Sequence, residues 1–139
     1  MLFRRRGGDP EFPKGDRGSG SLDDYRFDLL PAKAGTTIRL AGSDPHQDLL
    51  RDLVGVEPAE TAIARRTAEE ERIDAPLPVR IFVDGRIVGP VGRVPRGLES
   101  AVNEALSRLD MAGRKPRIPV QIVATRQGVR VDLLMGQTR

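Results

Sequence analysis

The strongest constraint on the fold is a pair of short apolar runs that are joined by Asp84 and Gly85. Residues 79–89 read VRIFVDGRIVG, and apolar side chains occupy alternate positions on both sides of this dipeptide. Alternation with a period of two is typical of a half-buried strand, and Asp-Gly suits the type I′ turn that joins two antiparallel strands. This segment therefore predicts a β-hairpin, and a sheet in which antiparallel pairs dominate.

Five other parts of the chain have the pattern of strands. Residues 25–30, 36–41 and 61–67 are short runs with partial alternation, and residues 118–122 and 129–133 alternate on either side of a turn at 126–128. The last two predict a closing hairpin. The acidic run Glu69, Glu70 and Glu71 is expected to be a solvated loop or strand end rather than a metal site.

Two segments have the period of a helix. The first begins at Asp44, which can cap the free amides, and Gln47 stands where a capping box needs its reciprocal partner. Apolar residues follow as far as Val54, and Gly55 can adopt the left-handed backbone conformation that commonly ends a helix. The second helix follows Pro95 and ends at Gly113. Together these elements predict an α+β fold, a small antiparallel and partly barrel-like sheet with two helices.

The first 24 residues are expected to form a disordered arm ahead of a single domain at 25–139. Seven of the first twenty residues are Gly or Pro, and the segment has no apolar periodicity. The chain has no cysteine, so it offers neither disulfides nor thiolate ligands. It also has no apolar run near the roughly 20 residues that span a bilayer, so we expect a cytoplasmic protein without a membrane partner.

The sequence offers little material for catalysis. It has one histidine, no cysteine nucleophile and no Gly-x-Ser-x-Gly elbow. Carboxylates at positions 74, 84 and 132 show no spacing that is typical of a magnesium site, and no phosphate-binding or dinucleotide motif is present. We therefore predict a non-enzymatic module without metal or cofactor. A hydrolase built on His46 and nearby carboxylates is kept as an alternative.

The basic residues are the best candidates for function. The net charge of +3 divides into 0 for residues 1–31, −3 for residues 32–77 and +6 for residues 78–139. Arg93 and Arg96 precede the second helix, whose first free amides attract an anion, and Arg86 leaves the hairpin turn. A further basic cluster follows that helix, where cations are favourable even without a ligand. It consists of Arg114, Lys115 and Arg117.

Aromatic residues, on which single-stranded nucleic acid usually stacks, are scarce. The chain has five phenylalanine and tyrosine residues, of which two fall in the predicted arm. Phe27 and Phe82 are expected in the core. Tyr25 and His46 are then the two rings in the body that could act as stacking platforms.

Several of these segments together resemble HIRAN domains, especially bacterial forms that accompany DNA-processing enzymes. The likeness lies in AGSDPHQDLL at 41–50, the hairpin at 79–89, Arg96 with the helix after it, and the closing strands VQIV and GVRVDL. The family implies a small barrel-like β-fold with two helices. In its helicase-linked members it also implies a pocket that holds the 3′ end of single-stranded DNA.

The resemblance is incomplete at the residues of that pocket. The family uses an aromatic-containing stretch at the first helix start, where this chain has Gly42, His46 and Gln47. It also uses an Asn-Pro-Tyr-Asp-x-Asn-Ala stretch before the central hairpin, which is absent here. The positions of its Asn, Tyr, Asp and second Asn are taken by Arg72, Asp74, Ala75 and Leu77. The family fold is thus expected, with end binding lost or altered.

Two functions from different classes follow. The first is a HIRAN-like accessory module that binds single-stranded DNA, DNA ends or the nucleic-acid backbone. Its expected contacts are Arg86, Arg93, Arg96 and His46, the cluster Arg114, Lys115 and Arg117, and the basic residues at 4–6. The second is a protein-interaction module on the same scaffold, with a DNA-processing protein as a partner. The sequence does not indicate an oligomeric state.

Overall fold

The computed structural model of the protein describes residues 16–139. Most of the predicted arm falls on residues 1–15 and so lies outside the described residues. The described part contains three α-helices, six strands and three short 3₁₀ turns. In chain order they are η1 (Leu22–Asp24), β1 (Ile38–Arg39), η2 (Asp44–His46), α1 (Gln47–Arg51), β2 (Ala59–Ala62), α2 (Ala68–Arg72), β3 (Pro78–Val83), β4 (Arg86–Arg93), α3 (Glu99–Met111), β5 (Val120–Thr125), β6 (Gly128–Leu133) and η3 (Met135–Thr138).

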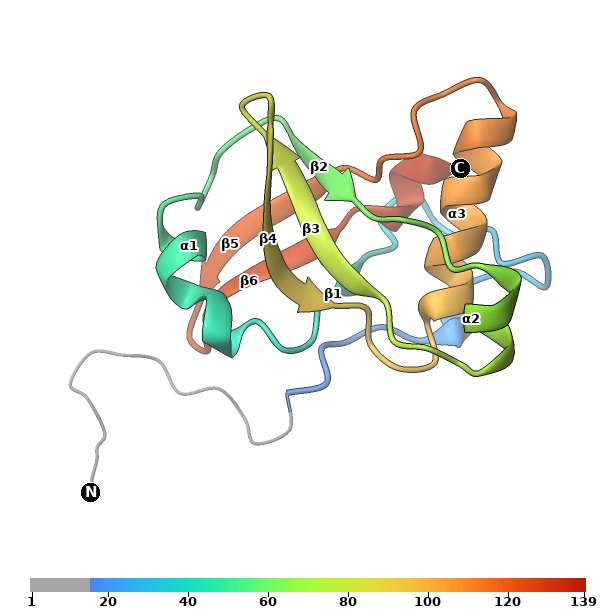
Figure 1. Ribbon diagram of the computed structural model, residues 1–139, viewed down its shortest axis with the longest axis horizontal. Coiled ribbons are helices and arrows are strands. Elements are labelled where there is room, and N and C mark those ends of the chain that lie inside the picture. Colours follow the sequence, from blue (N-terminus) through green and yellow to red (C-terminus); the bar gives the residue numbers. More distant parts are fainter. Residues whose placement is uncertain (1–15) are drawn as a thin grey trace.

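The strands form two antiparallel sheets of three strands each, in the orders β1-β6-β5 and β2-β3-β4. The two sheets lie against each other around a shared core (Figure 1). They meet at both edges, where Ala41 pairs with Arg93 and Glu60 pairs with Pro119. These single bridges join the sheets without a continuous ladder. The predicted α+β class with a partly barrel-like sheet is therefore confirmed.

The central hairpin has the geometry that its sequence predicts. Val83 pairs with Arg86, and Asp84 and Gly85 between them have φ angles of 52° and 73°. Two positive φ angles at the centre are the mark of a type I′ turn. Val79, Ile81 and Val83 on alternate positions of β3 are buried, which fixes the register of the hairpin against the core.

The predicted helix after Pro95 is present as α3, which packs beside the ends of the two sheets (Figure 1). Val102, Ala105, Leu106 and Leu109 are buried on its inner face, at spacings of three and four residues. Gly113 has a φ of 75° just beyond the helix, which is the left-handed backbone conformation expected of a glycine that ends a helix.

The structure contains a third helix, α2, which the sequence analysis did not predict. The acidic run at 69–71 lies in this helix rather than in a loop or strand end. Thr67 and Glu70 form a reciprocal capping box, and the three glutamates occupy the first turn, where the helix dipole favours negative charge. The strand predicted at 61–67 lies slightly earlier in the chain, as β2.

The strand predicted at 25–30 is wrong. Tyr25 pairs only with Pro31, and the backbone between them turns back on itself because the Arg26 amide bonds to the Leu30 carbonyl at 2.8 Å. Leu29 has a φ of 64°, which a strand does not allow. As a result Phe27, expected in the core, is fully exposed, whereas Tyr25 is buried.

The boundary predicted for the arm is too late in the chain. Residues 16–24 pack against the domain: Ser19 exchanges two backbone hydrogen bonds with Arg39, of 2.9 and 3.1 Å, and residues 22–24 form η1. The folded domain therefore includes at least residues 16–139.

Candidate nucleic-acid interface

The side chain of Asp16 fixes the first described segment at the edge of the domain. Its Oδ2 accepts a hydrogen bond from the Gly42 amide at 3.0 Å, and its Oδ1 accepts from the Gly18 amide at 3.1 Å. The same Oδ1 accepts from Nη2 of Arg130 at 2.9 Å, and both side chains of this ion pair are more than nine-tenths buried. Arg17 follows directly and is exposed. A buried carboxylate therefore determines where this arginine lies.

The end of β4 lies very close to the loop that follows β1. Ala41 and Arg93 exchange backbone hydrogen bonds of 2.8 and 2.9 Å, and Ser43 Oγ donates to the Val91 carbonyl at 2.8 Å. Gly42 has a φ of 69°, and a Cβ atom at this position would overlap the guanidinium of Arg93. A glycine at 42 thus leaves the space that the Arg93 side chain occupies.

These two features create a cationic pocket at the seam between the sheets. The pocket has a volume of about 490 Å³ and is lined by Arg17, Ala41, Arg93 and Arg96. Three of its four lining residues are arginines, and no carboxylate lines it. Among the described residues, neither Arg17 nor Arg93 has an ion-pair partner. A concave surface with unpaired guanidinium groups has the chemistry that binds phosphate or carboxylate oxygens.

Arg96 differs from its two neighbours because carboxylates already neutralise it. Its Nη2 donates to Asp74 Oδ2 at 2.9 Å and to the Asp74 carbonyl at 2.5 Å, and its Nη1 lies 2.9 Å from Glu99 Oε2. The other oxygen of Glu99 accepts from the Gly97 amide at 2.7 Å. The chain's own carboxylate therefore occupies the start of α3, where the sequence suggested an external anion.

Of the predicted contacts within residues 16–139, Arg93 and Arg96 line the pocket and the other five do not. The basic residues at 4–6 lie outside the described residues. His46 is half-buried at the junction of η2 and α1, and η2 packs against β4. Arg86 begins β4 and Arg93 ends it, so they lie roughly 20 Å apart along the strand. Arg114 and Lys115 are exposed beyond the other end of α3.

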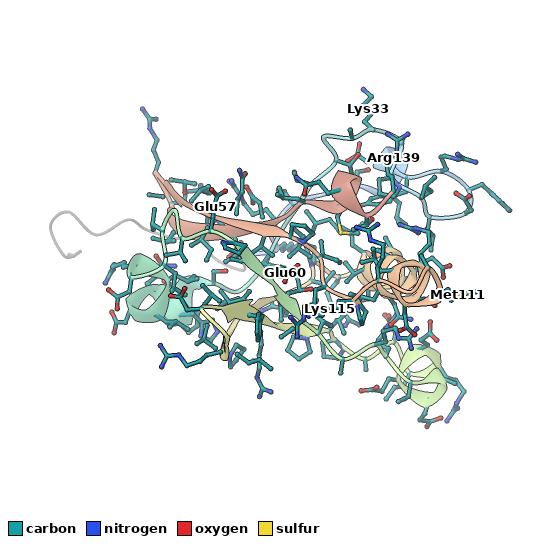
Figure 2. The ribbon with its side chains drawn as sticks, turned by 90° about the horizontal axis from the view of Figure 1, so that it is seen from above. Lys33, Glu57, Glu60, Met111, Lys115 and Arg139 are labelled. Atoms are coloured by element: carbon teal, nitrogen blue, oxygen red, sulfur yellow. The ribbon has the colours of Figure 1, made fainter. Side chains whose placement is uncertain are left out.

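Arg117 has a structural position on the outer face of the β2-β3-β4 sheet. Its guanidinium carbon lies 4.1 Å from the centre of the Phe82 ring, and its Nη1 lies 3.9 Å from Glu60 Oε1. Figure 2 shows Glu60 on its strand, with Lys115 labelled nearby in that view. Phe82 is therefore a partly covered outer-face residue, not a core residue.

Tyr25 does not serve as a stacking platform. Its ring is buried, and burial, reinforced by the negative charge of Asp24, raises the pKa of its phenol to about 12. His46 remains the one candidate ring from the predicted pair. Arg17, in turn, was missed by the sequence reasoning because its segment was assigned to the arm.

Residues 16–139 contain neither a candidate metal site nor a helix that could span a membrane. That part of the chain has no group of three or more His, Asp or Glu side chains that could hold a metal ion. It also contains no helix that is long and apolar enough to cross a membrane. Comparison of the chain with protein-family models, curated proteins and solved structures finds no match in any of the three.

Proposed function

We propose that this protein is a non-enzymatic module that binds the phosphate backbone of nucleic acid through the cationic pocket of Arg17, Arg93 and Arg96. The observation that carries the proposal is the guanidinium of Arg93, which lies over Gly42 beside Arg17, with neither arginine ion-paired within residues 16–139. A planar guanidinium can donate two parallel hydrogen bonds to one phosphate, which favours phosphate over a compact anion.

The position of the pocket also supports this function. It lies between the segments that occupy the places of the two pocket stretches of HIRAN domains, because Arg93 lies over Gly42 and Arg96 bonds to Asp74. The residues differ from the family pattern in being cationic, without a stacking tyrosine at position 74. We therefore expect binding to phosphates along a single strand, with little dependence on a free 3′ end.

Fluorescence anisotropy with a labelled single strand, its 3′-blocked form and a duplex tests this directly. If two or three phosphates are neutralised, affinity for the single strand should fall about 7- to 20-fold between 50 and 200 mM salt. Free and blocked 3′ ends should bind alike. A clear preference for the free end would instead indicate that end recognition is retained.

Substitution of the arginines separates this pocket from a generally basic surface. Arg93→Ala should weaken binding about tenfold and lower the salt slope by about 0.7, because one charged hydrogen-bond donor to phosphate is lost. Arg114→Ala makes the same change of charge at the far end of α3 and serves as the matched control. Equal effects of both substitutions, or no binding at low salt, would contradict the proposal. The second outcome would favour the protein-interaction module.

A further inference from the structure

Phe27 is the most exposed large apolar side chain in the described part of the protein. It is fully accessible to solvent, whereas Met111 and Ile73, the next two, are partly covered. Single exposed apolar residues are common on protein surfaces, so exposure alone does not indicate an interface. The construction of the surrounding loop is what makes this residue unusual.

The loop that presents Phe27, defined here as the tip loop (residues 25–31), is tightly hydrogen-bonded. The Leu29 amide donates to the Arg26 carbonyl at 2.8 Å, and the Leu30 amide donates to Asp28 Oδ1 at 3.2 Å. Tyr25 anchors the base of the loop in the core, and the light-blue segment that contains it projects past α3 (Figure 1). Because these hydrogen bonds already fix the backbone of the loop, presenting Phe27 to a partner costs little backbone conformational entropy.

Phe27 is flanked by one charge of each sign. Arg26 Nη2 lies 3.6 Å from Asp28 Oδ2, and more than half of each side chain is exposed. The tip loop therefore presents a cation, an apolar ring and an anion in sequence. With two positive and three negative groups, residues 22–33 have a net charge of −1, which disfavours nucleic acid or an anionic membrane as the partner.

The same chain contains a pocket with matching chemistry, which we define as the proline pocket. It has a volume of about 390 Å³, and its apolar walls include Pro76, Pro78 and Pro90. Three charged residues also line it: Glu70 and Arg80, which are exposed, and Arg66, which is buried and already paired with Asp74. One Glu70 oxygen accepts from the Thr67 amide, which leaves the other available. A pocket of this volume has room for a phenyl ring.

We propose that the protein self-associates through insertion of the tip loop of one copy into the proline pocket of a second copy. Phe27 lies among the prolines, Arg26 pairs with Glu70, and Asp28 pairs with Arg80. The contact joins two different surfaces, so each copy supplies one tip loop and one pocket. This inference is independent of nucleic-acid binding, which uses the cationic pocket.

Sedimentation velocity of the full chain from 10 µM to 1 mM, without nucleic acid, tests for association. Small interfaces with one anchor are weak, so we expect a dissociation constant on the order of 100 µM. Phe27→Ala should raise this constant at least tenfold. Met111→Ala, which shortens another highly exposed apolar side chain, should leave it unchanged. A protein that stays monomeric at 1 mM, or equal effects of the two substitutions, would overturn the proposal.

A charge exchange tests the pairing itself. Asp28→Arg and Arg80→Asp should each weaken self-association at least fivefold, because like charges then meet across the contact. An equimolar mixture of the two variants should associate as strongly as the unmodified protein, since the altered tip loop of one then matches the altered pocket of the other. Circular dichroism of each variant checks the fold. If folded variants fail to associate on mixing, the pairing is wrong.

Discussion

Tyr25 occupies an unfavourable position for a polar side chain. It is the single tyrosine of the chain, its ring is buried, and its hydroxyl has no hydrogen-bond partner among residues 16–139. A buried hydroxyl without a partner loses its hydration and gains nothing in return. The same surroundings oppose ionisation, which is why its pKa is raised to about 12.

This raised pKa predicts a loss of stability at high pH. The unfolded chain releases the phenolic proton near pH 10, whereas the folded protein keeps it until about pH 12. The contribution of Tyr25 to stability is therefore fully present below pH 10 and is lost as the pH rises toward 12. Phenolate absorbance during a pH titration reports this one residue, and an apparent pKa near 10 would contradict the prediction. Tyr25→Phe should change stability at neutral pH by no more than about 1 kcal/mol.

The roles of individual arginines depend on carboxylates that are distant in sequence. Arg93 and Arg96 are three positions apart, yet only Arg96 is paired, with Asp74 and Glu99. Asp16 pairs with Arg130, which lies 114 positions later in the sequence. The sequence could identify Arg93 and Arg96 as candidates from their place before a helix. It could not show which one is neutralised, because no local pattern records a contact between such distant residues.

At the scale of elements, Gln47 connects α1 to the sheet. Its Nε2 donates to the Ser43 and Val129 carbonyls, each at 3.0 Å, and its Oε1 accepts from the Val129 amide at 2.9 Å. This residue was predicted to complete a capping box, but its side chain instead forms hydrogen bonds with the backbone of β6. The helix is only five residues long, so this clamp and the buried Leu50 hold it in place.

Loss of the Gln47 side chain should therefore destabilise the whole domain. Gln47→Ala leaves the buried Val129 amide and carbonyl without these partners and creates a small cavity, at a cost of about 2–4 kcal/mol. Urea unfolding measures the change. Gln127→Ala, at an exposed position in the β5–β6 turn, is the matched control and should stay within about 0.5 kcal/mol. Similar values for both would refute the role of the clamp.

Elements with a strong local signal were predictable, and those that depend on a short signal or on distant contacts were not. The Asp84–Gly85 hairpin, the closing hairpin and α3 each combine periodicity with a turn residue, and all three are present. Thr67 and Glu70 carried the capping-box spacing that could have revealed α2, but the charge of the run obscured it. For residues 25–30, apparent alternation was misleading because the backbone turns at Leu29.

At the scale of the whole molecule, two narrow seams hold the sheets together. On one seam the Ala41–Arg93 pair also shapes the cationic pocket, and on the other Thr61 and Ile118 form the principal link. The Thr61 amide donates to the Ile118 carbonyl at 2.8 Å, and the Ile118 amide donates to Thr61 Oγ1 at 2.9 Å. Both residues are fully buried. A side chain thus replaces the backbone ladder that a closed barrel would have here.

Thr61→Val tests how far this seam supports the domain. Valine keeps the shape of threonine but leaves the Ile118 amide buried without an acceptor, which should cost about 1–3 kcal/mol in urea unfolding. Thr61→Ser retains the acceptor and should lose only the contribution of one methyl group, about 1 kcal/mol. Hydrogen exchange of the Ile118 amide distinguishes the two, because only the valine variant should open this seam more often. Unchanged exchange in Thr61→Val would show that the two sheets stay joined without the threonine hydroxyl, with the opposite seam and the shared core sufficient to hold them.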